Sequence, residues 1–571
     1  MGKSKTRKKL SGIRLYLLIV LLDIIIGGIG YYCIFPAINI HNLAFWLILI
    51  FFISFDTLLI AFSHFGDYFD KYMTGRELLK SIGKDALFVL LVDCAIVLIV
   101  LAGNLMGLKL FRAKDYASLI QVEERNFTED FQECESVSNI ALMDTESARI
   151  FGNREIGSLS DVVSQYEVAD DYNQINISGI PMKVSSLKYA SFFKWVKNRK
   201  SGVPGYVQVN AVNSDANYVK LNQGMKYVPS GYFNDNLQRH VQFQYPTKII
   251  DDYYFEVDDN GNPYYICPCL SSKIGLFSAM DVVGAIICDP ITGNCEYYNL
   301  KDIPNWVDRV FDGELCTRKY DWNGTLSGGY WNSIISQTGC KKTTDDYGYV
   351  TLDDDVWIYT GVTSLNSDQS NVGFVMVNQR TSETRYYSVS GAEEYSAMKS
   401  AEGAVQEKNY DASFPALINV MNQPTYIMVL KDSGGLVKMY AMVNVEQYNI
   451  VATGNTQNEV FSNYKKLLLE EGVDNSSDDT TENFVDITVD DIQYITTEGE
   501  TTVYIKGTNG IVFKQAFAEN EALIYINAGD KIKLYTNYTE ELAQEAANAN
   551  VVYSFTEFEF IEKATTAEPA F

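Results

Sequence analysis

Residues Gly284–Leu300 read GAIICDPITGNCEYYNL, and this pattern predicts one β-hairpin. Apolar residues lead into a cluster of turn-forming residues, and Cys295–Leu300 leads out of it. β-branched and aromatic residues favour half-buried strands, and an Asp side chain such as Asp289 initiates turns by accepting bonds from the following backbone. The same frame occurs twice more, as GYVQVNAVNSDANYVKL over Gly205–Leu221 and as GFVMVNQRTSETRYYSV over Gly373–Val389.

The three frames align without gaps. A glycine opens each frame, an Asn or Asp stands where the chain must turn, and a tyrosine occupies the same later position. These residues are Gly205, Gly284 and Gly373, then Asn210, Asp289 and Asn378, then Tyr218, Tyr297 and Tyr386. A fourth hairpin is expected over Tyr426–Asn444.

Segments with helical or mixed patterns separate the hairpins, at Tyr189–Arg199, Asn305–Phe311 and Gly391–Glu407. A hairpin of this size can bury one face against one helix, and a neighbouring unit would cover the other. We therefore expect an α+β fold with three or four copies of a helix-plus-hairpin unit.

Three apolar segments lie near the amino terminus, at Leu15–Cys33, Phe45–Phe62 and Ala86–Leu108. Each is long enough to cross the hydrocarbon layer of a bilayer. A cleaved signal peptide is the alternative for the first segment, but two further segments follow it and no cleavage pattern precedes a soluble region. The sequence predicts a three-span anchor over residues 15–108.

The orientation of the anchor follows from the basic residues of its short loops. Residues 1–14 contain six Lys or Arg and no acid, the loop at Asn42–Ala44 has no basic residue, and Ser63–Asp85 has four. Cytoplasmic loops carry the excess of Lys and Arg. We therefore expect a cell-membrane protein with a cytoplasmic amino terminus and with the residues after Leu108 outside the cytoplasm.

Each predicted span contains one carboxylate, at Asp23, Asp56 and Asp93. A carboxylate inside the apolar layer is costly and usually faces protein or a water-filled cavity. Hydrogen bonding between the helices is one interpretation. A role in an ion path, or in pairing with a basic group of another membrane subunit, is the alternative.

The chain after the anchor divides by composition. An extracytoplasmic α+β repeat region is expected over residues 109–455, followed by a helix and an acidic linker over 456–482. Thr456 and Glu459 form a capping box for that helix. A small all-β domain is expected over 483–563 and a tail over 564–571. The expected strands of the β domain include Val503–Lys506, Ile511–Phe513, Ala522–Asn527 and Lys531–Tyr535, with a short helix at Glu540–Ala547.

The net charge of −26 argues against nucleic-acid binding, because phosphate contacts need clustered Lys and Arg. His240 is the only histidine after the third span. Catalysis by a Ser-His or Cys-His pair and a His-rich zinc site are therefore not expected. No phosphate-binding loop occurs, and we predict no metal site and no cofactor.

Nine cysteines are present, and an extracytoplasmic location permits disulfides. Cys288 and Cys295 flank the hairpin turn and are the candidate disulfide pair. Cys267 and Cys269 are expected to be buried thiols, because the single residue between them does not fit redox or zinc motifs.

One stretch resembles a known module. Val283–Tyr298, through Asp289, Thr292 and Gly293, resembles the hairpin of PepSY-type extracytoplasmic modules, whereas the other two frames lack the Thr-Gly pair. Four stretches resemble a group of bacterial membrane-anchored proteins: Ser158–Val168, Gln244–Ile250, Ile274–Tyr298 and Tyr320–Ile335. The resemblance implies location and architecture but no activity, and PepSY modules are associated with peptidase inhibition or envelope regulation.

The leading hypothesis is a non-enzymatic membrane protein that binds a protein or envelope polymer through its ectodomain, as a scaffold or regulator. One alternative is an acidic-residue hydrolase of envelope glycan or peptide, which would need two carboxylates in a cleft. The other is an accessory subunit of a membrane complex that uses the three intramembrane Asp residues.

Overall fold

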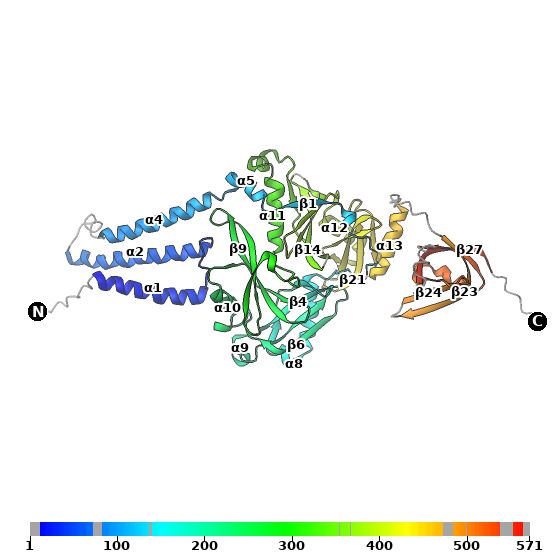
Figure 1. The fold of residues 1–571 in the computed structure, drawn as a ribbon, viewed down its shortest axis with the longest axis horizontal. Coiled ribbons are helices and arrows are strands. Elements are labelled where there is room, and N and C mark those ends of the chain that lie inside the picture. Colours follow the sequence, from blue (N-terminus) through cyan, green and yellow to red (C-terminus); the bar gives the residue numbers. More distant parts are fainter. Residues whose placement is uncertain are drawn as a thin grey trace, which may run out of the picture. The chain divides into compact units, whose positions relative to one another are not determined.

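The computed structural model describes residues 12–71, 83–134, 136–137, 140–352, 354–365, 367–471, 484–497, 500–536 and 552–563. It is an α+β protein in which three apolar helices precede a series of β-sheets with helices between them (Figure 1). The chain divides into two compact units, Met1–Leu467 and Leu468–Phe571.

The predicted apolar helices are confirmed as α1 (Gly12–Ile34), α2 (Leu43–Lys71) and α4 (Gly83–Leu105). Each contains a window of 18 or 19 residues that is apolar enough to cross a membrane. α2 continues to Lys71, beyond the predicted end of its span at Phe62. It lies between α1 and α4 (Figure 1).

One end of this helical group contacts the sheets. After α1, the Ile38 amide donates to Pro246 O at 2.7 Å. His41 Nδ1, just before α2, lies 2.8 Å from Leu276 O, and the Leu276 amide donates to Gly103 O, near the end of α4, at 3.3 Å. The end of α1, the start of α2 and the end of α4 therefore lie on the same side as the sheets.

Four sheets follow the anchor, and their strands pair in the same way. In each sheet two short strands pair with successive halves of one edge of a long strand, and two further strands continue antiparallel from its other edge. The first sheet contains β2 (Tyr166–Val168), β3 (Asn173–Ile177), β4 (Ile180–Tyr189), β5 (Val203–Asn210) and β6 (Ala216–Met225). The second contains β7 (Ile249–Ile250), β8 (Tyr254–Val257), β9 (Pro263–Ile274), β10 (Ser278–Cys288) and β11 (Cys295–Asn299).

The third and fourth sheets repeat this order. The third contains β12 (Lys341–Thr343), β13 (Gly348–Leu352), β14 (Asp355–Ser364), β15 (Ser367–Asn378) and β16 (Thr384–Tyr387), with β1 (Val122–Arg125) and β17 (Gly391–Ala392) added. The fourth contains β18 (Asp411–Ala412), β19 (Ala416–Val420), β20 (Gln423–Lys431), β21 (Val437–Asn444) and β22 (Val451–Gly454).

A helix precedes each sheet along the chain, and another follows the last one. These helices are α7 (Thr145–Gly157), α10 (Leu237–Gln244), α11 (Gly313–Leu326), α12 (Glu394–Ala404) and finally α13 (Gln457–Glu470). Asn305–Phe311, where a helical or mixed pattern was expected, forms no helix. Its amides are used elsewhere, since Asp308 and Arg309 donate to the Glu256 carboxylate.

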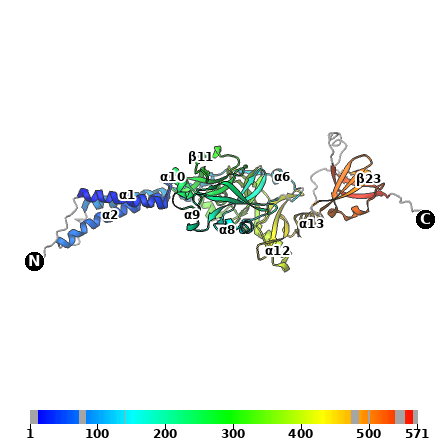
Figure 2. The same cartoon turned by 90° about the horizontal axis from the view of Figure 1, so that it is seen from below.

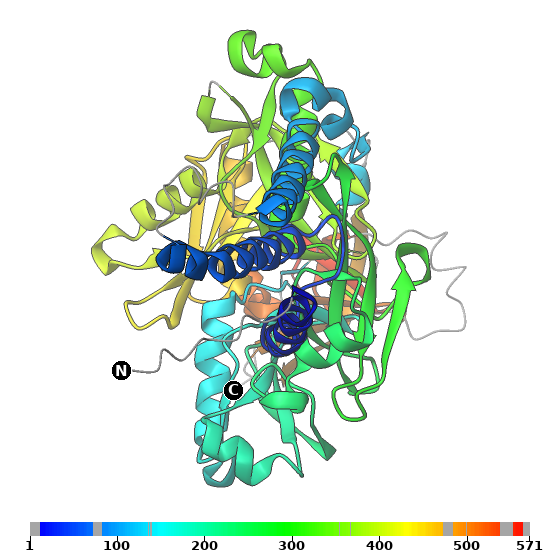
Figure 3. The ribbon, with the colours of Figure 1, turned by 90° about the vertical axis from the view of Figure 1, so that its left-hand side faces the viewer.

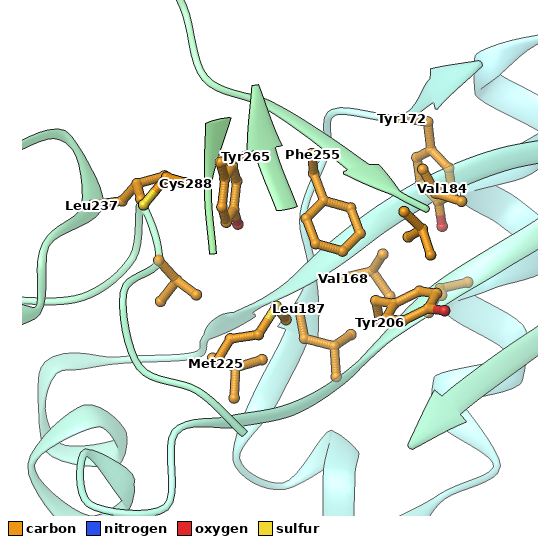
Figure 4. Packing of buried hydrophobic residues seen from close by; sticks show 14 of the residues in the cluster. Val168, Tyr172, Val184, Leu187, Tyr206, Met225, Leu237, Phe255, Tyr265 and Cys288 are labelled. Atoms are coloured by element: carbon orange, nitrogen blue, oxygen red, sulfur yellow. The ribbon is translucent and has the colours of Figure 1, made fainter. Parts of the chain in front are cut away.

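Each pair of successive sheets shares one hydrophobic core. The first core joins the first and second sheets and includes Tyr206, Phe255 and Tyr265 (Figure 4). The second core takes Ile287 from the second sheet, and the opposite faces of the third sheet serve the second and third cores. Successive strand residues point to opposite faces, so strands buried on both sides read as continuous apolar runs.

The three aligned hairpins share one register. Val207 pairs with Tyr218, Ile286 with Tyr297, and Val375 with Tyr386. In each hairpin the tyrosine ring covers the opening glycine: a Cβ added at Gly205, Gly284 or Gly373 would lie 2.5–2.6 Å from a ring carbon or hydroxyl of Tyr218, Tyr297 or Tyr386. The repeated Gly and Tyr are therefore cross-strand contact partners.

The second unit contains a closed barrel. Its strands are β23 (Phe484–Thr497), β24 (Glu500–Gly507), β25 (Val512–Ala516), β26 (Lys531–Thr536) and β27 (Val552–Glu562). Ala522–Asn527, expected as a strand, instead lies mostly in a short 3-10 helix, Glu521–Tyr525, whose first turn Asn520 caps at Ala522 N. The expected helix Glu540–Ala547 lies outside the described residues.

Candidate functional site

The carboxylates of the three apolar helices are brought into contacts between helices. Asp23 of α1 and Asp56 of α2 interact through their side chains. Asp93 of α4 accepts a hydrogen bond from Ser54 Oγ of α2 at 2.7 Å. One oxygen of each carboxyl group is buried with no hydrogen-bond partner among the described residues. The arrangement connects all three helices, as an associating role requires.

The three predicted turn residues perform the same local task. The Oδ1 atoms of Asn210, Asp289 and Asn378 accept from the amide two residues later at 2.8, 2.8 and 2.9 Å. Each also donates its own amide to the carbonyl five residues on, at 2.9 Å. These side chains thus fix the hairpin turns.

Cys288 and Cys295 face each other directly across β10 and β11. The neighbouring pair is hydrogen-bonded, because Asp289 N donates to Asn294 O at 2.9 Å. The cysteines therefore occupy a non-hydrogen-bonded position, where facing side chains lie closest. Their sulfurs, present as thiols, are 2.8 Å apart.

His240 of α10 lies beside this cysteine pair. The ligand atoms of His240, Cys288 and Cys295 all lie within 4.8 Å of one another. His240 Nε2 is 2.8 Å from Gly293 O and 2.8 Å from Gln244 Nε2, and its ring stacks on Tyr227 at 3.9 Å. Hydrogen bonds from Cys288 and His240 lower the pKa of the Cys295 thiol.

The group of Cys288, Cys295 and His240 can react in two ways. The pair can oxidise to a disulfide, or the three donors can hold a thiophilic ion such as Zn²⁺. The expectation of no metal site considered His240 as a lone histidine and did not group it with Cys288 and Cys295. His240 lies far from the cysteines in sequence, and only the packing of α10 against the hairpin brings them together.

Two adjoining cavities lie among the sheets, and no local sequence pattern predicted them. One has a volume of about 440 Å³ and borders Tyr172, Tyr254 and Arg309. The other has a volume of about 410 Å³ and borders Gln174 and Lys183. Both are lined by Thr145, the first residue of α7, and by Tyr349 of β13.

Lys183 is the distinctive residue of the second cavity. It is only 1% exposed, and its Nζ has one long contact, 3.4 Å to Thr145 Oγ1. The ammonium lies 5.4 Å from the centre of the Tyr349 ring. Among the described residues no carboxylate forms an ion pair with it, since nearby Asp144 is bound by Lys431. Burial lowers the pKa of Lys183 to about 8.

Further donors point to the same place. Gln174 pairs with Lys183 across β3 and β4, and its Nε2 is buried without a partner in the described chain. α7 begins at the cavity, and its N-terminus is already capped by the Asp144 carboxylate, which accepts from Ser147 N at 2.8 Å. The two features that favour an anionic group are therefore the buried cation and the Gln174 amide, which has no partner among the described residues.

Arg309 supplies a second cation, in the first cavity. Its guanidinium donates to Asn173 Oδ1 at 2.7 Å and to Asp312 Oδ1 at 2.6 Å, and lies 4.0 Å from the Tyr254 ring centre. The Asp312 carboxylate therefore already balances most of its charge. Among the described residues, Lys183 has no such partner.

Two acids behind Arg309 are closed to solvent. Glu256 is 0% and Asp308 2% exposed. Glu256 accepts from the amides of Asp308 and Arg309 at 3.0 and 2.8 Å, and Asp308 accepts from Asn176 N at 2.7 Å. Burial raises the pKa of both groups. Neither lines the two cavities, so the pair positions the backbone before Arg309.

Comparison with protein-family models and with curated proteins found no match for this chain. The arguments on function therefore come from the residues and their geometry.

Proposed function

We propose that this is a membrane-anchored protein whose extracytoplasmic region is a non-enzymatic binding module for a protein or envelope polymer. The three apolar helices support the anchor. In the sequence, the basic residues of 1–14 are at the start of α1, and those of Ser63–Asp85 are between the middle of α2 and the start of α4, whereas the end of α1, the start of α2 and the end of α4 contact the sheets. With the positive-inside rule, this supports an extracytoplasmic location for the sheets.

The four sheets support a modular ectodomain. Each combines a preceding helix with the same five-strand order, and each neighbouring pair shares a core. We propose that they are four copies of one unit, related to PepSY-type modules through the Asp289 turn. Stacked units of this kind present extended binding surfaces.

The observation that carries the binding proposal is Lys183, buried beside a cavity without a carboxylate partner. A buried charge without a partner is costly, so a site that retains one is suited to a ligand that brings the opposite charge. We propose that the ligand group is a carboxylate, as found at peptide termini and on envelope polymers. The chain carries −26 overall, and this field would repel a polyanion, which favours a ligand with one isolated negative group.

The alternatives have less support. A hydrolase needs a carboxylate pair open to substrate, whereas Glu256 and Asp308 are buried away from the two cavities. An accessory-subunit role needs intramembrane carboxylates that face a partner. Asp23, Asp56 and Asp93 instead contact neighbouring helices of the same chain.

Ligand-observed NMR on the full chain in detergent tests the proposal. The probe is N-acetylglycine, and N-acetylglycinamide is its uncharged control. We expect saturation transfer to the acid and not to the amide, lost in Lys183→Met and retained in Lys301→Met, where the replaced side chain is exposed. Equal transfer to both probes, or unchanged transfer in Lys183→Met, would contradict it.

A further inference from the structure

An aromatic surface lies beside the outer end of the anchor. Tyr32 is in the last turn of α1, and its hydroxyl donates to Asn234 Oδ1 at 3.0 Å. Arg239 of α10 donates to Tyr32 O at 2.8 Å and lies 4.4 Å from the Tyr32 ring centre. Phe243 of α10 stacks on Tyr31 at 5.5 Å. In Figures 1 and 2, α10 lies next to the end of α1.

These contacts fix the height of the neighbouring residues relative to a bilayer. The apolar window of α1 ends at Ile34, so Tyr32 lies where aromatic residues meet the headgroups. Asn234 is at the same level because it is bonded to Tyr32. Phe233, which directly precedes Asn234, is 57% exposed.

The aromatic surface continues onto α9 (Phe192–Asn198). Trp195 is buried and lies 5.8 Å from Phe233, between ring centres, while Phe192 lies 5.0 Å from Tyr232. Phe193 is 80% exposed and Val196 47% exposed. A soluble surface rarely exposes so many large apolar side chains together.

The charge around α9 is opposite to that of the protein. Residues 189–200 read YASFFKWVKNRK, with four basic residues and no acid, in a chain of net charge −26. Alternating aromatic and basic side chains are typical of segments that lie in the membrane interface, with rings among the acyl ends and charges on anionic headgroups.

A second group of exposed apolar side chains lies near the end of α4, away from α1. Phe111, shortly after α4, is 68% exposed, and Trp331 and Ile335 are 65% and 73% exposed. Tyr330, next to Trp331, packs in the same cluster as Tyr116 of α5 (Lys109–Ala117). Figure 3, viewed from the side of the helices, shows the sheet region extending beyond them.

We propose that the ectodomain docks on the outer membrane surface through a docking face formed by Phe192, Phe193, Val196 and Phe233 with the basic residues of α9, and that its partner is an anionic bilayer. The inference rests on the proposed membrane location. The occupant follows from continuity with α1 and from charge complementarity. Docking would add a second restraint to the contacts with α1 that orient the cavities relative to the membrane.

Site-specific spin labelling of the full chain in vesicles tests this. A ketone-bearing phenylalanine analogue carries the nitroxide, which leaves the nine native cysteines unchanged. The label is placed at Phe193 or Phe233, at Leu98 of α4 as the lipid reference, and at Tyr448 as the water reference. Oxygen concentrates in lipid and a nickel complex stays in water, so their relaxation effects report depth.

We expect labels at Phe193 and Phe233 to match Leu98 and not Tyr448 in vesicles that contain phosphatidylglycerol. Replacement of Lys194, Lys197, Arg199 and Lys200 by Gln should shift the ratio of lipid-exposed to water-exposed label toward water by about fivefold for each charge. A lipid-like Leu98 with a water-like Phe193 would overturn the docking proposal alone. A water-like Leu98 would overturn the anchor as well.

Discussion

Lys183 and Gln174 face each other across β4 and β3, and neither has a full set of polar partners in the described chain. The two side chains occupy one end of a cavity at the start of α7. Other buried polar side chains of the strands, such as Glu256 and Asp281, have hydrogen-bond or ion-pair partners. The contrast marks this pair as the most informative place for mutation.

Lys183→Met should stabilise the unliganded protein. Methionine fills a similar volume without the desolvation cost of a buried ammonium, which is on the order of several kcal/mol for an ion without a partner. Thermal unfolding at pH 7 measures the effect, with Lys301→Met as the control. A large loss of stability would mean that Lys183 has a structural partner.

The stability contribution of Lys183 should depend on pH in a defined direction. Its folded pKa of about 8 is below its ordinary value of 10.5, so the folded state binds fewer protons between these values. Stability should therefore rise with pH from about 8 to 10.5, and N-acetylglycine should bind more weakly over the same range. Both trends should vanish in Lys183→Met. A wild-type protein that matches the variant at every pH would contradict the assignment.

The contribution of Glu394 to stability should depend on pH in the direction opposite to that of Lys183. Burial raises its pKa from 4.5 to about 7, so the folded state retains a proton that the unfolded state has lost. This group should reduce stability as pH rises from about 4.5 to 7. Glu394→Gln keeps one oxygen that can accept from Gly361 N and offers an NH2 group that can donate to Thr344 Oγ1, and should remove that slope. Unfolding curves of both proteins at pH 5 and pH 7.5 measure it, and parallel curves would contradict the prediction.

Gly284→Ala should destabilise the second sheet. The added Cβ would lie 2.3 Å from Tyr298 O and 2.6 Å from the Tyr297 hydroxyl oxygen. Overpacking of this kind costs about 1–3 kcal/mol. Gly403→Ala in α12 is the matched control, because no heavy atom lies within 4 Å of its added Cβ and alanine favours helices. Equal melting temperatures for the two variants would contradict the Gly–Tyr contact.

Cys288 and Cys295 should form a disulfide when the protein matures outside the cytoplasm. Their directly facing, non-hydrogen-bonded positions bring the sulfurs within reach. Peptide mapping without reduction should recover them linked, and Cys288→Ser should leave Cys295 open to alkylation. Metal analysis tests the alternative. One bound zinc per chain that is lost in His240→Gln, with Cys288 and Cys295 not linked to each other, would contradict the disulfide and indicate a metal site.

Local patterns were sufficient to predict much of the architecture. Apolar length identified α1, α2 and α4, and the spacing of Gly284, Asp289 and Tyr297 identified a hairpin whose register recurs twice. These features depend on neighbours in sequence. Asn305–Phe311 shows the limit, since its amides bind Glu256 from another sheet and no local pattern encodes that partner.

The candidate sites depend on distant contacts. Sequence analysis did not single out Lys183, because the residues of α7 and β13 that share its cavity are far from it in the sequence. The group of His240, Cys288 and Cys295 was not predicted for the same reason, because these residues meet only in the folded chain. Composition does not indicate which polar residues the folded chain leaves without partners.

The central claim is that the bilayer separates the amino terminus from the sheets. A membrane-impermeant maleimide applied to intact cells tests it, with one cysteine introduced at exposed Tyr448 and, in a second variant, at Ser4. A background without the nine native cysteines, verified to retain the wild-type melting curve, isolates each signal. The account predicts labelling at position 448 in intact cells and at position 4 only after the membrane is opened. Labelling at position 4 in intact cells, with position 448 protected, would contradict it.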